Sequence, residues 1–274
     1  MNGVGYRVGA ALLTLCLCNI AVATAGPEVV ANTLTAKEKA TGWKLLWDGK
    51  TSAGWRSAHG PDFPVGGWSI RDGMLIVPEA GGAEAKAAGD IITLDKFSNF
   101  ELEVDFKITL GANSGIKIFV DPELNKGEGS AIGPEFQILD DERHPDAKLG
   151  REGNRTLGSL YDMKAAPIDK KVNPLGQWNH ARIVSKDKQL TYWLNGAKTV
   201  DIERGGEEWR RLVAISKYRI WPNFGELPEG HILLQDHGNQ VCYKNIKIRD
   251  FSKKQRQHHP DARFRSCRPV LPAR

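Results

Sequence analysis

Apolar and charged side chains alternate along much of this chain. The pattern is clearest in residues 100–108, where apolar side chains take every second position and Glu, Asp or Lys the positions between. Successive side chains of an extended strand point to opposite faces, so this segment predicts a strand with one buried and one wet face. Residues 189–200 predict a hairpin, because Asn195-Gly196 tolerates the positive φ angles of a two-residue turn.

Short apolar segments bounded by Gly, Asp or Asn recur from residue 42 onward. We expect further strands at residues 43–47, 68–77 with a break at Asp72-Gly73, 91–94, 115–120, 135–139, 181–185, 231–235 and 241–248. No long apolar pattern of helical period is visible, and one helical turn is expected near Thr35 to Glu38. Many short strands without an internal repeat predict an all-β sandwich or barrel.

Residues 140–177 form a long segment with little strand character. Loops of this length are usually functional or disordered. The motif Gly158-Ser159-Leu160-Tyr161 has the composition of ordered structure, so we interpret this loop as functional.

Both ends of the chain differ from the body. In residues 1–25, Arg7 precedes a short apolar run, and Ala23-Thr24-Ala25 offers small residues for cleavage before Gly26. This is the form of a signal peptide, so we expect an exported protein, periplasmic or extracellular. The bulky Leu before Cys16 and before Cys18 disfavours a lipid anchor. No apolar stretch is long enough to predict a transmembrane segment.

The rest divides into a leader at residues 26–41, one domain at residues 42–251 and a basic tail at residues 252–274, which we expect to be disordered. The tail holds seven Lys and Arg residues against a lone Asp261, so it carries the net charge of +5. The body is slightly acidic and has no electrostatic reason to bind nucleic acid. Outside the signal peptide the cysteines are Cys242 and Cys267, and both a bridge between them and two separate thiols stay open.

Residues 135–140 are the sharpest candidate for chemistry. On a strand Glu135 and Gln137 share one face, and Asp140 joins them only if a bulge re-aims it. The spacing is similar to the bulged acidic strand of sandwich-fold β-glucanases. A two-carboxylate glycosidase needs two correctly spaced carboxylates, however, and here the middle residue is Gln. The alternative is an ordinary exposed strand face.

Two further motifs carry candidate groups. His237 follows the apolar strand 231–235 and is suited to proton transfer near neutral pH, although a polar loop residue is the alternative. Its neighbour Asp236 points away from it in an extended chain. In Asn113-Ser114-Gly115 the Gly permits close approach of another backbone or a ligand, and Lys117 beyond it reaches either solvent or a cleft. Tyr161, Asn154 and Arg155 of the long loop could reach the same cleft. Trp55, Trp68 and Trp221 lie near loops and serve either the core or sugar stacking.

Taken in order, these motifs resemble the 3-keto-disaccharide hydrolase domain family. The resemblance covers residues 42–250 and rests on Leu46-Trp47-Asp48-Gly49-Lys50, Gly54-Trp55, residues 68–75, Asn113-Ser114-Gly115, residues 135–140 and 158–161, Trp178-Asn179, residues 193–196 and 234–238, and Asn245-Ile246. It implies a single concanavalin/laminin-G-like jelly-roll β-sandwich domain in an exported bacterial enzyme that acts on 3-keto glycosides or disaccharides.

The resemblance also implies roles for the candidate residues. A ketone at C3 acidifies the C2 proton, so a base can start β-elimination of the C1 substituent, and water then adds. We expect His237 as base and Glu135 as acid/base or metal ligand. Lys117, Gln137 or a bound divalent cation would stabilise the enolate, and Asp140 and Asp236 would orient these groups or ligate that cation. The substrate-binding residues would be Gln137, Asp140, Asn113, Ser114, Tyr161, Asp236 and Trp68. One divalent metal cation would be held by Glu135, Asp140 and His237. The alternatives are a lectin-like carbohydrate-binding module and an ordinary sandwich-fold glycoside hydrolase. Sugar, linkage and oligomeric state stay open.

Overall fold

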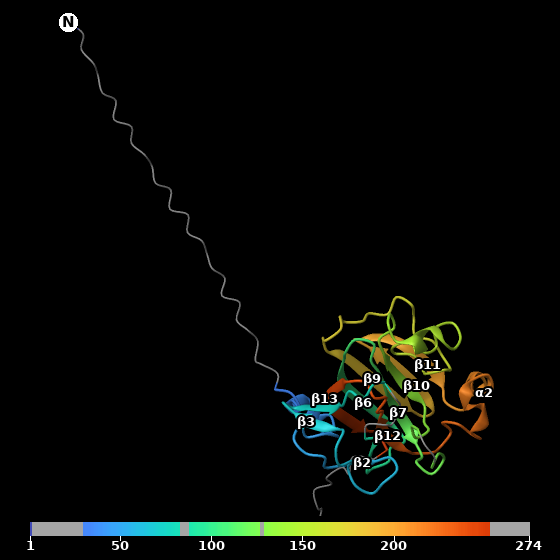
Figure 1. Cartoon of the computed structure of the whole chain (residues 1–274). Helices are drawn as coiled ribbons and strands as arrows, with labels where there is room; N and C mark the ends of the chain where they lie inside the picture. Colours follow the sequence, from blue (N-terminus) through green and yellow to red (C-terminus); the bar gives the residue numbers. More distant parts are fainter. Residues whose placement is uncertain (2–29, 83–87, 127–128, 253–274) are drawn as a thin grey trace, which may run out of the picture. The chain divides into compact units, whose positions relative to one another are not determined.

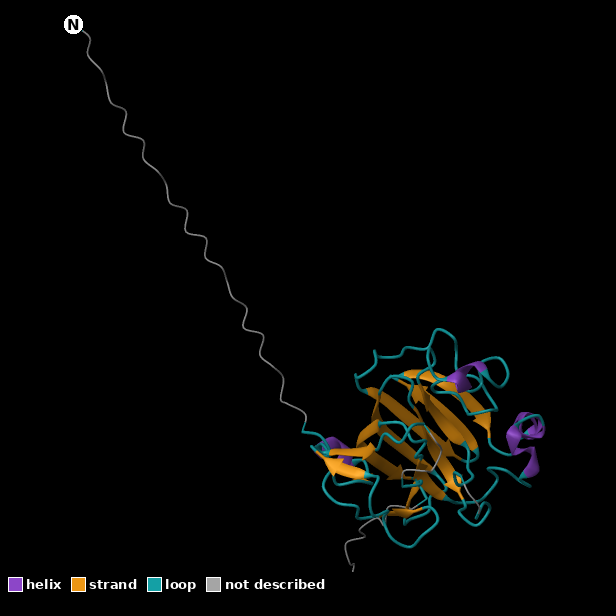
Figure 2. Cartoon of the chain, viewed as in Figure 1, coloured by secondary structure: helices purple, strands orange, loops and turns teal. Residues whose placement is uncertain are grey.

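Two antiparallel sheets dominate the computed structural model, which describes residues 1, 30–82, 88–126 and 129–252 (Figure 1). The larger sheet runs in the order β11-β10-β9-β6-β13-β4-β3, and β1 also pairs with β13. The smaller sheet runs in the order β2-β5-β12-β7-β8. Helical segments lie at the margins of the sheets (Figure 2). The described residues from Ala31 to Ser252 form one compact unit.

The strands are short and lie between residues 43 and 250, with long segments free of strands after β8 and after β11. Those of the larger sheet are β1 (Trp43–Leu45), β3 (Ser69–Arg71), β4 (Met74–Val77), β6 (Phe100–Ile108), β9 (Asn179–Lys186), β10 (Gln189–Leu194), β11 (Ala197–Glu203) and β13 (Val241–Asp250). Those of the smaller sheet are β2 (Trp55–Ser57), β5 (Ile91–Thr93), β7 (Asn113–Val120), β8 (Glu135–Leu139) and β12 (His231–Leu234). The helical segments are α1 (Ala36–Ala40), α2 (Glu207–Ala214), and the 3₁₀ helices η1 (Pro145–Lys148) and η2 (Lys217–Ile220).

The predicted all-β jelly-roll sandwich is confirmed, and each predicted strand is present. Asn195 and Gly196 turn the β10–β11 hairpin with φ angles of 48° and 81°. The strand β2 and the helix α2 were not predicted. Helix α2 could not be predicted from the sequence because its eight residues bury only Trp209 and Leu212, too few to reveal a helical period.

The main core lies between the two sheets and fixes which face of the smaller sheet looks outward. Phe136 of β8 packs there, with its ring centroid 5.4 Å from Tyr192 and 6.4 Å from Phe106. Ile138 of the same strand belongs to the same core cluster. Because side chains alternate along a strand, Glu135 and Gln137 lie on the opposite, outer face of the smaller sheet.

The segment before β1 is tied to the sandwich. The backbone N–H of Asn32 donates to Asn245 Oδ1 at 2.6 Å, and that of Asn245 donates to Asn32 Oδ1 at 2.8 Å. Glu38 of α1 forms an ion pair with Lys247 of β13. The described part of the predicted leader is therefore anchored on the larger sheet, and its helical turn near Thr35 is confirmed as α1.

Several predictions about the chain ends fall outside the described residues. These are the signal peptide with its cysteines, the tail from residue 253, and Cys267, whose pairing with the buried Cys242 was left open. Within residues 30–82, 88–126 and 129–252, no helix is long and apolar enough to cross a membrane.

Candidate active site

The outer face of the smaller sheet presents polar side chains in three rows. Lys117 of β7 faces Glu135 of β8 in the first row, Gly115 faces Gln137 in the second, and Asn113 faces Leu139 in the third. Directly paired residues share one face of a sheet. We call this the polar face. From Lys117 to Asn113 it extends about 13 Å, since a strand rises about 3.3 Å per residue.

Lys117 is buried at one end of the polar face. Its ammonium group donates to Ala131 O at 3.1 Å and to Ser130 Oγ, and it lies 4.0 Å from Glu135 Oε2. It lines a hollow of about 280 Å³ together with Tyr218 and Trp221. Of the two placements predicted for Lys117, the one in a cleft is confirmed.

Glu135 leans over Gly115 into the second row. A Cβ atom built on Gly115 would lie 2.8 Å from Cδ and 2.9 Å from Cγ of Glu135 and would overlap its Oε1. Real Cβ atoms do not approach other heavy atoms so closely. The group that approaches Gly115 closely is thus the Glu135 side chain, and not the backbone or ligand that the sequence led us to expect.

Several buried polar atoms on this face have no hydrogen-bond partner among the described residues. They are both amide atoms of Gln137, Oδ1 of Asn113 and Nδ1 of His237. Leaving a buried polar group unpaired costs about 1–3 kcal/mol, so native proteins satisfy nearly all of them. Their concentration on one face indicates a site that hydrogen-bonds a polar ligand.

His237 stands at the far end of the polar face. Gln235 donates its N–H to Gly115 O at 3.0 Å, and continuing this register brings His237 beside Asn113. Its ring meets that of His144 edge to face, with centroids 5.6 Å apart. Burial, and then the charge of His237, lower the pKa of His144. Sequence reasoning missed His144, because nothing near it in the sequence points to a partner 93 positions away.

The long loop forms a wall beside β8. The N–H of Tyr161 donates to Glu135 O at 3.0 Å, and that of Gln137 donates to Ser159 O at 3.1 Å. The Tyr161 hydroxyl donates to Asp146 Oδ2 at 2.8 Å. Arg155 ties Asp146 to Asp162 with two ion pairs of 2.8 Å. Burial and the Glu135 charge raise the pKa of Tyr161. The loop is therefore ordered next to the polar face.

Four other predicted site residues are engaged in the scaffold. Ser114 Oγ donates to Gln235 O at 2.6 Å, and the ring of Trp68 stacks on Tyr243 at 6.3 Å. Asp140 accepts from the N–H of Gly111 at 2.8 Å, and Asp236 accepts from the N–H groups of Ala88 and Gly89 at 2.8 and 2.9 Å.

The β7–β8 register is continuous from Glu135 to Leu139, so no bulge within it re-aims Asp140. Among the residues that the structure describes, no three His, Cys, Asp or Glu side chains lie close enough to hold a metal ion. The predicted ligands Glu135, Asp140 and His237 are thus not gathered. Metal binding stays a prediction without support from this arrangement.

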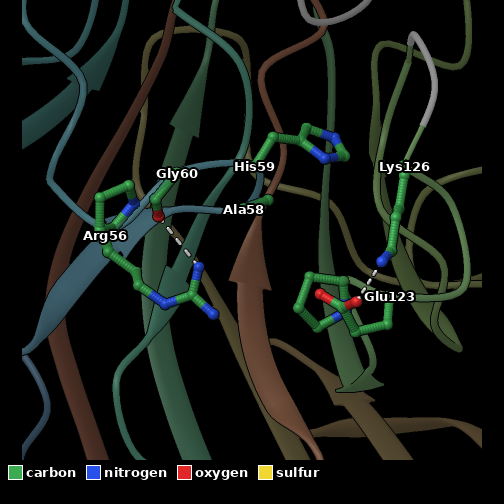
Figure 3. A pocket seen from close by; sticks show the side chains of 8 residues that line it. Arg56, Ala58, His59, Gly60, Glu123 and Lys126 are labelled. Carbon is green, nitrogen blue, oxygen red and sulfur yellow. Dashed lines mark hydrogen bonds and ion pairs between the residues drawn. The ribbon is translucent and has the colours of Figure 1, made fainter.

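A second hollow of about 360 Å³ lies beside strand β2 (Figure 3). There Arg56 donates to Gly60 O at 3.0 Å, and Lys126 pairs with Glu123. Its cations are thus occupied by local partners. The polar face combines buried charges with unpaired polar atoms and is the stronger candidate.

Comparison with known proteins matches the domain as a whole. Residues 42–249 match the family model of the 3-keto-alpha-glucoside-1,2-lyase-like domain. A 3-keto-disaccharide hydrolase from Bacteroides thetaiotaomicron is 36% identical over 230 residues, which are 77% of this chain and 79% of that protein. A solved structure of a candidate glycosyl hydrolase from Parabacteroides distasonis has a TM-score of 0.70 at 33% identity and covers 81% of this chain and 99% of that chain. A second from the same organism has a TM-score of 0.57 at 28% identity and covers 76% and 98%.

Because the Glu135 carboxylate lies over Gly115, we expect substitutions at the two positions to be energetically coupled. We expect Gly115→Ala to lower the free energy of unfolding by about 1–3 kcal/mol, because the new methyl group overlaps the carboxylate. In a Glu135→Ala background the cost should fall by about 1 kcal/mol or more, measured by urea denaturation. Gly60→Ala is the control, since its Cβ would be 3.6 Å from the nearest atom. Equal costs in both backgrounds would show that Glu135 does not lie over Gly115.

The imidazole pair predicts a linked titration. In His237→Gln the pKa of His144 should rise, because a nearby positive charge that disfavours its protonation is gone. NMR titration of the His144 ring protons measures this change. His180→Gln, which removes an imidazole bonded to Asp105 on the larger sheet, should leave the titration unchanged. A His144 curve that is the same in His237→Gln and wild type would contradict the pairing.

Proposed function

The chain belongs to the 3-keto-alpha-glucoside-1,2-lyase-like domain family, and on that premise we propose that it cleaves the glycosidic bond of 3-keto glycosides. Cleavage proceeds by β-elimination across C1 and C2, followed by addition of water. One observation carries the proposal, namely the order of groups along the polar face. A cation, a carboxylate and an imidazole follow one another at Lys117, Glu135 and His237.

The reaction needs three chemical groups of the protein in a fixed spatial order. Removal of the C2 proton places negative charge on the C3 oxygen, which a cation stabilises. The proton itself needs a base at C2, and the departing C1 oxygen needs an acid. In a pyranose ring the C3 oxygen, C2 and the C1 oxygen follow one another around the ring. A site for this reaction therefore needs cation, base and acid in the same sequence.

The polar face supplies that sequence. Lys117 Nζ binds the C3 oxygen, and the Glu135 carboxylate, seated over Gly115 between the outer rows, takes the C2 proton. The C1–oxygen bond then breaks as C1 and C2 form a double bond, and protonated His237 gives its proton to the leaving oxygen. The sequence hypothesis gave the base role to His237. Glu135 takes it here because its carboxylate lies next to Lys117 and His237 stands at the far end.

Water completes the reaction. Neutral His237 accepts a proton from the water that adds to C1. Glu135 exchanges its proton with the water that enters the site and then delivers a solvent-derived proton to C2. Atoms balance to net hydrolysis, and both groups regain their starting protonation. The amide of Gln137 and the Asn113 carbonyl oxygen, both buried, hydrogen-bond the sugar hydroxyl groups in between.

The hollow beside Lys117 fits the sugar. Trp221 and Tyr218 line it, and an aromatic wall packs well on the apolar face of a pyranose. Of the three Trp residues considered for stacking, Trp55 and Trp68 are buried in the core and Trp221 is partly exposed. Trp221 is therefore our sugar-stacking residue. The signal peptide expected at residues 1–25 would place this chemistry outside the cytoplasm.

Turnover of matched substrates tests the proposal. The protein should release the aglycone from a 3-keto glucoside and not from the unoxidised parent, with or without a chelator. Glu135→Gln and Lys117→Met should each lower kcat/KM by about 10²–10⁴-fold, since each removes one group that acts in the transition state. Glu103→Gln is the control, because it removes a carboxylate from β6 of the larger sheet.

Other results would support other functions. Cleavage of the unoxidised parent would indicate an ordinary glycoside hydrolase. Binding of either sugar without cleavage would indicate a lectin-like module. Loss of activity with the chelator would support the predicted divalent metal cation. Less than a tenfold loss in Glu135→Gln would remove the base role from Glu135.

A further inference from the structure

Asp90 is a buried carboxylate that contacts two segments of the site at once. Its Oδ2 atom accepts from Ser130 Oγ and from the N–H of Ala131 at 3.2 Å. Its Oδ1 atom accepts from the N–H of Asp236 at 2.9 Å. Ser130 in turn receives a hydrogen bond from Lys117 Nζ, and Asp236 directly precedes His237. One carboxylate thus lies between the two ends of the polar face.

We propose that Asp90 and Ser130 are positioning residues that aim Lys117 and His237 at the substrate. The inference rests on the proposed function and adds to it two residues that neither the sequence motifs nor the predicted site contained. Neither residue needs to touch the substrate. Each acts through a neighbour, Ser130 through Lys117 and Asp90 through both Ser130 and Asp236.

The arm toward Lys117 fixes the direction of an ammonium group. Lysine has three N–H donors on a flexible stem, so partners decide where each donor points. Ser130 Oγ and Ala131 O take two donors, and both lie on a segment that Asp90 holds. The third donor remains on the side of Glu135, 4.0 Å away, where the C3 oxygen would bind.

Charge adds a second reason for this arm. A buried ammonium group is costly unless it is paired and hydrogen-bonded. Glu135 is one counter-charge, but in the proposed reaction it becomes neutral when it takes the C2 proton. Asp90, connected through the Ser130 hydroxyl, then remains as the negative charge coupled to Lys117. The hydrogen bonds from Lys117 through Ser130 to Asp90 therefore hold the ammonium group in place during the step in which the C3 oxygen is negatively charged.

The arm toward His237 clamps the backbone on both sides of the imidazole. On one side the N–H of Asp236 is held by Asp90. On the other side the N–H of Gly238 donates to Asp236 Oδ1 at 2.9 Å. The Oδ2 atom of Asp236 accepts from Ala88 and Gly89, which adjoin Asp90 in the sequence. The residue predicted to orient the catalytic groups, Asp236, therefore does so through the backbone.

Turnover of a 3-keto glucoside by Ser130→Ala and Asp90→Asn tests the positioning roles. We expect kcat to fall about 10–100-fold with KM changed less than about threefold, because misplacement of a reacting group by about 1 Å is that costly. Ser130→Thr keeps the hydroxyl and should recover most of the rate. In a Lys117→Met background, Ser130→Ala should cost less than about twofold more. Ser185→Ala, which removes a buried hydroxyl from β9, is the control.

A chemical readout separates this inference from the proposed function. Reductive methylation of the full protein, followed by peptide mass spectrometry, reports how well Lys117 is held. Its methylation should accelerate about tenfold or more in Ser130→Ala and Asp90→Asn but not in Ser185→Ala, since the ammonium group loses its buried partners. Unchanged methylation together with unchanged kcat would overturn the inference. If the variants are methylated faster but the wild-type protein does not cleave 3-keto glycosides, the positioning of Lys117 is supported and the proposed function is contradicted.

Discussion

A buried lysine and a buried glutamate face each other across two neighbouring strands, and the rest of the site follows from satisfying them. Taking such charges out of water costs several kcal/mol per ion unless each finds partners. Lys117 has Glu135 at 4.0 Å and the Ser130–Ala131 segment, and that segment has Asp90. Glu135 has the space above Gly115, which any larger residue would fill. The need to satisfy the two charges thus explains why Gly115, the Ser130–Ala131 segment and Asp90 lie where they do.

The sandwich makes this arrangement rigid. Strand β8 presents Phe136 and Ile138 to the core and Glu135 and Gln137 to the polar face. A slip of one residue in its pairing with β7 would exchange the two sets and turn Glu135 and Gln137 toward the core. The same apolar contacts that hold the sheets together therefore hold the proposed catalytic groups in register. The long loop then pairs with the free edge of β8 and closes the site on that side.

Alternation made much of this site visible in the sequence. Glu135, Gln137 and Lys117 were predicted on strands, and the strand period placed the first two on one face. The apolar strand before His237 marked that residue as a candidate, and the family resemblance gave it a role. Asp90, Ser130 and His144 stayed hidden, because their partners lie far along the chain and polar contacts between loops leave no periodic trace. The hydrogen bonds of Asp140 stayed hidden for a related reason. The sequence shows a carboxylate after a strand, but only the folded backbone shows that Asp140 accepts hydrogen bonds from Gly111 and from the turn after β8.

The fate of the hydrogen at C2 is the most direct measurement of the chemistry. A 3-keto glucoside is cleaved in D₂O, and the C2 position of the released 3-keto sugar is examined by NMR. The same sugar incubated without protein corrects for spontaneous exchange. If Glu135 removes the C2 proton and hydration returns one, the released sugar carries deuterium at C2 at the rate of cleavage. Release of the aglycone with the original hydrogen kept at C2 would mean direct displacement at C1 and would contradict elimination on the polar face.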